Sequence, residues 1–279
     1  MPESLELAAR DGTRLAATLY RPAGAARHAA LLHAATGTPR RFYGKFAAYL
    51  AERGIAVLTF DYRGIGESRR GPLRGLGARM RDWAQLDAGA ALEFLAREFG
   101  GSKLLAVGHS FGGNGLGLVP GVERYAGALF VGVQSGYWRH WRGTARAGMW
   151  FLVHVLLPSF AALLGYVPMK AFGQGEDLPG GVAAEWASWC RNPRYAAGAV
   201  GAEGYARLTA PIRSYWVSDD LYAPRAAAEA LFDLYPHAAS TELVPIDASA
   251  HGGIGHFGFF RERFRGTLWR DAADWLLAA

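Results

Sequence analysis

Cysteine is almost absent from this chain, because Cys190 is the only one among its 279 residues. A single thiol excludes an intramolecular disulfide and any metal site built from several cysteines. No His-x-x-x-His spacing occurs, and the glycines of residues 108–113 lack the Gly-x-Gly-x-x-Gly register of a dinucleotide site. We therefore expect neither a metal nor another cofactor.

Lysine is scarce as well, with only Lys45, Lys103 and Lys170 in the chain. The net charge of +6 comes from arginines that are scattered, apart from a modest cluster within residues 69–81. No nucleic-acid-binding motif accompanies them. We interpret the basic composition as a property of the source genome and expect no nucleic acid partner.

The first residues lack a basic segment followed by an apolar one, so they do not form a secretory signal, and we expect a cytoplasmic protein. One longer stretch, residues 147–169, carries no full charge and could nominally cross a bilayer. It is interrupted by His154, Pro158, Ser159, Gly165 and Pro168. We expect a buried or substrate-facing helical insertion there, with no stable membrane insertion.

Apolar residues are plentiful, at 51% against 19% charged, which is enough for a sizeable core. Short apolar runs alternate with segments of helical spacing, and Asp11-Gly12 marks a hairpin turn near the start. This pattern predicts an α/β fold with a mostly parallel eight-stranded sheet and helices on both faces. The expected strands are residues 5–9, 14–20, 29–33, 55–60, 104–108, 128–133, 212–217 and 241–246; the expected helices are 42–53, 82–99, one beginning at 110, and 256–277.

The alternation breaks once, over residues 135–208, which are rich in tryptophan and glycine. We interpret this segment as a helical cap inserted after the sixth strand. The core domain would then consist of residues 1–134 and 209–279.

The most specific motif is Gly108-His109-Ser110-Phe111-Gly112, at the end of an apolar strand and the start of a helix. A nucleophilic serine must project from a sharp strand-to-helix turn, where only small residues fit two positions before and after it. The following helix aims N–H groups at a developing oxyanion. We therefore predict that Ser110 is a catalytic nucleophile.

A serine nucleophile needs a histidine base and an acid that orients it, and in one known arrangement the acid and the histidine follow the serine in that order. The strand 212–217 ends in Asp219 and Asp220, and either could be the acid. We favour Asp220 because a proline follows it four residues later. Beyond the last strand stand His251 and His256, of which we favour His256, placed behind a glycine at the expected helix start.

The expected oxyanion donors are two backbone N–H groups. One belongs to Phe111, and the other to Ala35 or Thr36, with a preference for Thr36. Large aromatic side chains of the insertion favour a hydrophobic substrate pocket. We expect it to be lined by Trp138, Trp150, Trp186, His109 and His251.

These motifs resemble the α/β-hydrolase superfamily, in particular its serine aminopeptidase (S33)-like and monoacylglycerol lipase-like branch. The resemblance rests on residues 56–68, 108–113, 220–224 and 256. A closer match, on residues 35–37, 82–83, 165–166, 185–187 and 255–261, is to a bacterial group of predicted α/β-hydrolases without a settled substrate. The resemblance implies that Asp61 and Arg63 form a structural turn. His33-Ala34 departs from the more usual His-Gly and leaves the exact oxyanion donor open.

The resulting hypothesis is a serine hydrolase that cleaves a small or medium hydrophobic ester through an acyl-enzyme. One alternative is an aminopeptidase or amidase, in which Glu176, Asp177 or Glu185 would hold a substrate ammonium group. Another is a non-catalytic binding protein on the same fold. A homodimer is compatible with the sequence.

Overall fold

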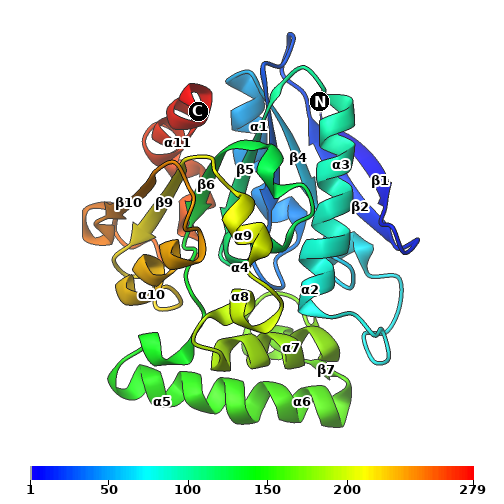
Figure 1. The fold of residues 1–279 in the computed structure, drawn as a ribbon, viewed down its shortest axis with the longest axis vertical. Coiled ribbons are helices and arrows are strands. Elements are labelled where there is room, and N and C mark those ends of the chain that lie inside the picture. The colour runs from blue at the N-terminus through cyan, green and yellow to red at the C-terminus, as the bar shows by residue number, and fades with distance from the viewer. Residues whose placement is uncertain (1) are drawn as a thin grey trace.

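A single large sheet runs through the molecule in the computed structural model, which describes residues 2–279 (Figure 1). Its strand order is β1-β2-β4-β3-β5-β6-β9-β10. The strands are β1 (Glu3–Ala8), β2 (Arg14–Tyr20), β3 (His28–His33), β4 (Ile55–Phe60), β5 (Lys103–His109), β6 (Tyr125–Val131), β9 (Ile212–Val217) and β10 (Thr241–Ile246). β1 and β2 run antiparallel to each other, β2 runs antiparallel to β4, and the other pairings are parallel. The predicted eight-stranded, mostly parallel α/β sheet is confirmed.

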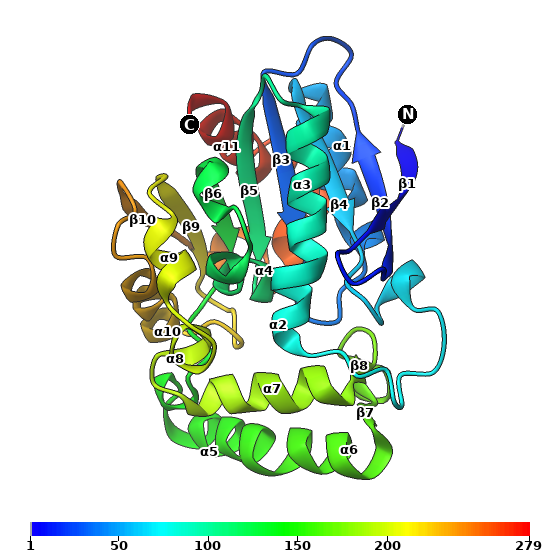
Figure 2. The same ribbon diagram turned by 45° about the vertical axis from the view of Figure 1, so that its right-hand side comes forward.

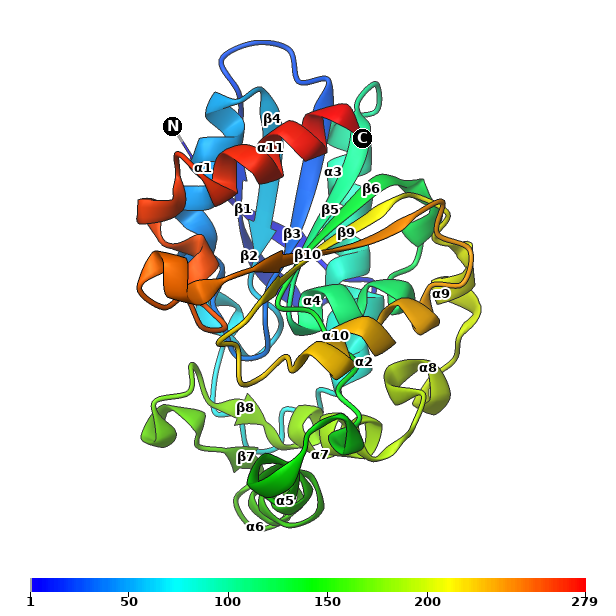
Figure 3. The same ribbon diagram turned by 90° about the vertical axis from the view of Figure 1, so that its left-hand side faces the viewer.

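The central strands are apolar on both sides because helices cover both faces of the sheet. Every residue of β4 is buried, and β5 is buried from its second residue on. On one face α1 (Gly44–Glu52) packs beside α11 (Leu268–Ala278); on the other lies the helix formed by α2 (Met80–Asp82), a π-helical turn (Trp83–Ala88) and α3 (Gly89–Glu98) (Figures 2 and 3).

The expected extent of the last helix is wrong. The helix after Ser110, α4, spans only Phe111–Asn114, and the last helix begins at Leu268 instead of residue 256. Between residue 256 and Leu268 the chain forms short 3-10 turns instead, among them Gly258–Phe260. Phe259 and Phe260 are consecutive and both buried, and the Phe259 carbonyl accepts a 2.7 Å hydrogen bond from the Trp269 indole. This packing holds the chain in turns until the amphipathic stretch from Leu268 onward.

The chain leaves the sheet after β6 and returns to it at β9; we call residues 135–208 the inserted segment. It contains α5 (Gly143–Phe151), α6 (Leu157–Leu164), α7 (Gly180–Arg191), α8 (Tyr195–Ala199), α9 (Glu203–Arg207) and the short strands β7 (Tyr166–Val167) and β8 (Leu178–Pro179). A π-helical turn, Leu152–Leu156, joins α5 and α6 into one long helix. This helix is the outermost layer, with α7 between it and the carboxyl ends of the strands (Figures 1 and 2).

Candidate active site

Ser110 stands on a strained turn between β5 and α4. Its backbone dihedral angles are φ 51° and ψ −117°, a conformation that L-residues rarely adopt. A Cβ atom at Gly112 would overlap the His33 carbonyl group, and one at Gly108 would lie 2.6 Å from the Cα of Gly113. The steric reason for the two glycines is therefore confirmed, and the turn presents Ser110 at the carboxyl edge of the sheet.

His256 and Asp220 lie against each other at the same edge. His256 Nδ1 and Asp220 Oδ2 are 2.7 Å apart, and both side chains are buried. Asp220 Oδ1 accepts hydrogen bonds from the backbone N–H of Tyr222, at 2.9 Å, and of Ala223, at 3.2 Å. A carboxylate so held places the proton of a neutral imidazole on Nδ1 and leaves Nε2 as the nitrogen that can accept one.

The neighbouring carboxylate of Asp219 has a different set of contacts. Its oxygens accept hydrogen bonds from the backbone N–H groups of Ile254, at 2.9 Å, and Gly255, at 2.7 Å. His251, the alternative to His256, also lies elsewhere: its ring packs against Phe264, with ring centroids 5.5 Å apart. The structure thus places Asp220 and not Asp219 against His256, while Asp219 holds the loop that leads to it.

The backbone donors expected for an oxyanion differ in their availability. The N–H of Ala35 donates to the Tyr43 hydroxyl at 2.8 Å and is therefore occupied. The N–H groups of Thr36 and Phe111 have no acceptor within residues 2–279. Of the two alternatives on the loop after β3, Thr36 is the one with a free donor.

His109 lies beneath the site and does not line it, contrary to expectation. Its Nδ1 accepts from the Tyr43 hydroxyl at 2.8 Å, and its Nε2–H donates to the His256 carbonyl at 2.9 Å. Burial holds the pKa of His109 well below its usual range, so the ring is neutral. A chain of hydrogen bonds thus runs from Ala35 through Tyr43 and His109 to the backbone of His256.

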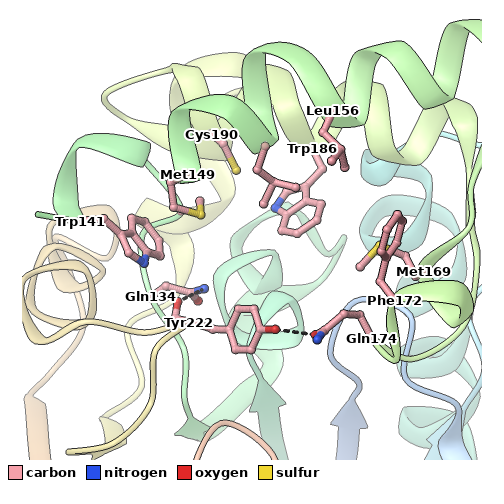
Figure 4. Close-up of a pocket in the computed structure, with 12 residues that line it drawn as sticks. Gln134, Trp141, Met149, Leu156, Met169, Phe172, Gln174, Trp186, Cys190 and Tyr222 are labelled. Carbon is pink, nitrogen blue, oxygen red and sulfur yellow. Dashed lines mark hydrogen bonds between the residues drawn. The ribbon is translucent and has the colours of Figure 1, made fainter. Parts of the chain in front are cut away.

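Two adjoining cavities open at this edge. The smaller, of about 80 Å³, is lined by Ser110 and His256 and also by Ala35 and Thr36. The larger, of about 330 Å³, has mostly apolar walls and extends beneath the long helix of the inserted segment (Figure 4). Both are lined by Gln134, Met169, Gln174, Trp186 and Tyr222.

A few polar groups interrupt the apolar wall. The Tyr222 hydroxyl donates to the Gln174 side-chain oxygen, and the Gln134 amide donates to the Tyr222 carbonyl at 3.2 Å (Figure 4). The Gln134 side-chain oxygen is buried and has no hydrogen-bond partner in the described part of the chain. The lining is therefore apolar with an amide group at the junction of the two cavities.

Of the expected pocket residues, only Trp186 lines these cavities. Trp138 and Trp150 instead pack their rings against His154, with centroids 5.7 Å and 5.0 Å away. The expectation for these two residues and for His251 is wrong, because aromatic size indicates burial and not the direction of the side chain. Sequence reasoning missed Gln134, which follows β6 just as Asp220 follows β9, so its position at a strand end could have indicated it.

The turn after β4 is held by charged pairs outside the cavities. Asp61 accepts from the backbone N–H of Arg40 at 2.6 Å, and Arg63 donates to Asp87 at 2.8 Å. Burial raises the pKa of Asp87 to about 6 despite this partner. Among residues 2–279, no group of three or more His, Cys, Asp or Glu side chains is arranged to hold a metal ion.

Comparison with known proteins identifies the fold. Residues 29–135 match the family model described as serine aminopeptidase, S33. The esterase domain of a Rhodothermus marinus protein is 19% identical, with 98% of each chain covered and a TM-score of 0.60. A soluble variant of monoglyceride lipase from Saccharomyces cerevisiae, in complex with a substrate analog, is 16% identical over 100% of this chain and 95% of that chain, with a TM-score of 0.72.

A third similar structure is an esterase from Pyrococcus furiosus, 14% identical over 100% of this chain and 91% of that chain, with a TM-score of 0.65. No curated protein matches the chain by sequence. These matches confirm the resemblance to the α/β-hydrolase superfamily that the motifs indicate. The chain has the α/β-hydrolase fold.

Proposed function

We propose that the protein is a serine hydrolase of carboxylic esters with a small or medium hydrophobic group. The observation that carries this proposal is the 2.7 Å contact between His256 Nδ1 and Asp220 Oδ2 beside a cavity that Ser110 and His256 both line. A serine on a strained turn, with a histidine whose tautomer is set by a buried carboxylate, is the arrangement that nucleophilic acyl transfer requires.

In this mechanism, His256 Nε2 takes the proton of the Ser110 hydroxyl while Oγ bonds to the ester carbonyl carbon. The carbonyl oxygen becomes negative and is stabilised by the N–H groups of Phe111 and Thr36. The alcohol leaves with the proton from His256, and an acyl group remains on Ser110. Water then attacks the acyl carbon, again with His256 as base, and releases the carboxylic acid.

The inserted segment acts as a cap in this proposal and supplies the apolar walls of the larger cavity. Among the described residues that line the two cavities, none is an aspartate or glutamate. Glu185 is held by Arg81, and Glu176 accepts from the backbone N–H of Gly66 at 2.8 Å. An aminopeptidase site would need a free carboxylate for the substrate ammonium, so the lining favours an uncharged, apolar ester.

The test is hydrolysis of p-nitrophenyl esters from acetyl to dodecanoyl by wild type and Ser110→Ala. A mostly apolar cavity of about 330 Å³ favours an acyl group of medium length, so we expect turnover to peak between acetyl and dodecanoyl. The Ser110→Ala variant should fold and lose turnover. A folded wild type that neither hydrolyses any ester nor reacts with a fluorophosphonate probe would contradict the proposal.

A further inference from the structure

The long helix Gly143–Leu164 has an unusual surface. The most apolar 18-residue stretch of this helix has a mean hydropathy of 1.9, yet only 11% of that stretch is buried. Leu163 is 74% exposed, Phe151 is 51% exposed and Val155 is 36% exposed. The helix is long and apolar enough to cross a membrane, but it lies along the outside of the inserted segment (Figure 1).

A surface helix of a water-soluble domain normally carries polar residues on its outer side. Here the outer side has no charged residue between Ala147 and Leu164, and the exposed apolar side chains continue onto Phe172, which is 51% exposed. A contiguous apolar surface of this kind marks a binding surface. The inner side of the helix is not open to a partner, because Val153 and Leu157 are buried in the core and Leu152 lines the larger cavity.

Positive charges flank the apolar surface. Arg139, Arg142 and Arg146 are exposed near the start of the helix, and Lys170 is exposed shortly after its end. None of these four side chains lies within 4 Å of a carboxylate in the described part of the chain. Arg139 and Arg146 lie over the Trp138 ring, at 5.2 Å and 5.7 Å from its centroid, and keep their full charge there. Cationic groups without a carboxylate partner around an apolar helix complement anionic headgroups above hydrocarbon chains.

We propose that the helix Gly143–Leu164 and its basic flanks form a reversible docking surface for anionic lipid bilayers, with the helix lying in the plane of the interface. It does not span the bilayer, because its inner side forms core and cavity wall. Docking would place the helix that lines the larger cavity against the lipid. The delivery of a lipid-borne ester to that cavity rests on the proposed function, whereas docking itself does not.

The test is flotation of the full-length protein with vesicles of dioleoylphosphatidylcholine alone or mixed with dioleoylphosphatidylglycerol. We expect binding to the mixed vesicles that weakens as salt is raised. Phe151→Ser and Leu163→Ser should each lower the partition constant about tenfold, from lost apolar burial. Arg142→Gln and Arg146→Gln should each lower it about fivefold.

A matched control is Arg97→Gln. Arg97 lies near the C-terminal end of α3, and that end points away from α5 and α6 (Figure 2). The Arg97→Gln variant should therefore bind vesicles as wild type does. Phe151→Ser should keep wild-type turnover of a soluble ester, which shows that it folds. Ser110→Ala should bind vesicles normally, so a failed esterase assay leaves the docking result intact.

The proposal is overturned if wild type does not float with the mixed vesicles, or if Phe151→Ser and Leu163→Ser float as well as wild type. A wild type that fails to float and sediments as a dimer, which Phe151→Ser converts to a monomer, would assign this surface to a second copy of the chain.

Discussion

The buried hydroxyl of Tyr43 offers a sharp test of how the site is held together. It accepts the Ala35 N–H at 2.8 Å and donates to His109 Nδ1 at 2.8 Å, and Tyr43 is fully buried. Tyr43→Phe keeps the ring and leaves two buried polar groups unpaired. Each unpaired group costs about 1–3 kcal/mol, so the free energy of unfolding should fall by about 2–6 kcal/mol.

Tyr125→Phe is the matched control. The Tyr125 hydroxyl is also buried but bonds only to His33 Nε2, at 2.9 Å, so its loss leaves one unpaired group and should cost about 1–3 kcal/mol. Only Tyr43 connects the loop that carries Thr36 to the backbone of His256. We therefore expect Tyr43→Phe to lower kcat/KM for a p-nitrophenyl ester by about tenfold or more, and Tyr125→Phe to leave it near wild type.

Urea unfolding and ester kinetics on the two variants provide the measurements. The reasoning is refuted if both substitutions destabilise the protein equally, or if Tyr43→Phe loses stability but retains wild-type kcat/KM. The second result would mean that the hydrogen-bond chain stabilises the fold without positioning the reacting groups.

Three further predictions concern the same region. Asp220→Asn should lower kcat by about 10⁴-fold, because His256 loses the carboxylate that sets its tautomer. Asp219→Asn only loosens the loop before His256 and should lower kcat by about tenfold, as steady-state kinetics on the folded variants will measure. Gly112→Ala should lower the free energy of unfolding by at least about 3 kcal/mol, because the added Cβ would overlap the His33 backbone. Gly148→Ala, where the added Cβ meets open space in α5, should raise the free energy of unfolding by about 0.5–1 kcal/mol, and calorimetry on both variants measures the difference. Burial lowers the pKa of His33 from 6.5 to about 3, so the unfolded chain takes up a proton at this residue that the folded chain does not. His33 alone should therefore lower the free energy of unfolding by about 1.4 kcal/mol per pH unit as pH drops below 6.5, and His33→Gln should remove that contribution in urea melts from pH 6.5 to 4.5.

The sequence predicts those features whose physical cause is local. The apolar run of β4, Ile55–Phe60, and that of β9, Ile212–Val217, lie where the pattern places them. Ser110 could be recognised because the steric demands of its turn act within five residues. The sequence favours Asp220 over Asp219 by loop spacing alone, because adjacent residues at a strand end differ only in the groups that each one contacts in the folded chain.

The walls of the larger cavity could not be predicted in the same way. Gln174 and Tyr222 form a hydrogen bond there although they lie 48 residues apart in the sequence. Trp138 and Trp150 are large and apolar, but both pack against His154 within the inserted segment and not against the cavity. The role of Tyr43 could not be predicted either, because it depends on a contact with His109 at the end of β5, 66 residues away in the sequence.

The path of the chain from β6 to β9 has an evolutionary consequence. These strands are parallel neighbours, so topology demands a crossover of about a dozen residues, which α8 and α9 could provide alone. The remainder of the inserted segment exceeds that demand. A lineage could shorten, lengthen or exchange it and so acquire a new substrate range, while the serine, the aspartate and the histidine stay on loops of an unchanged sheet.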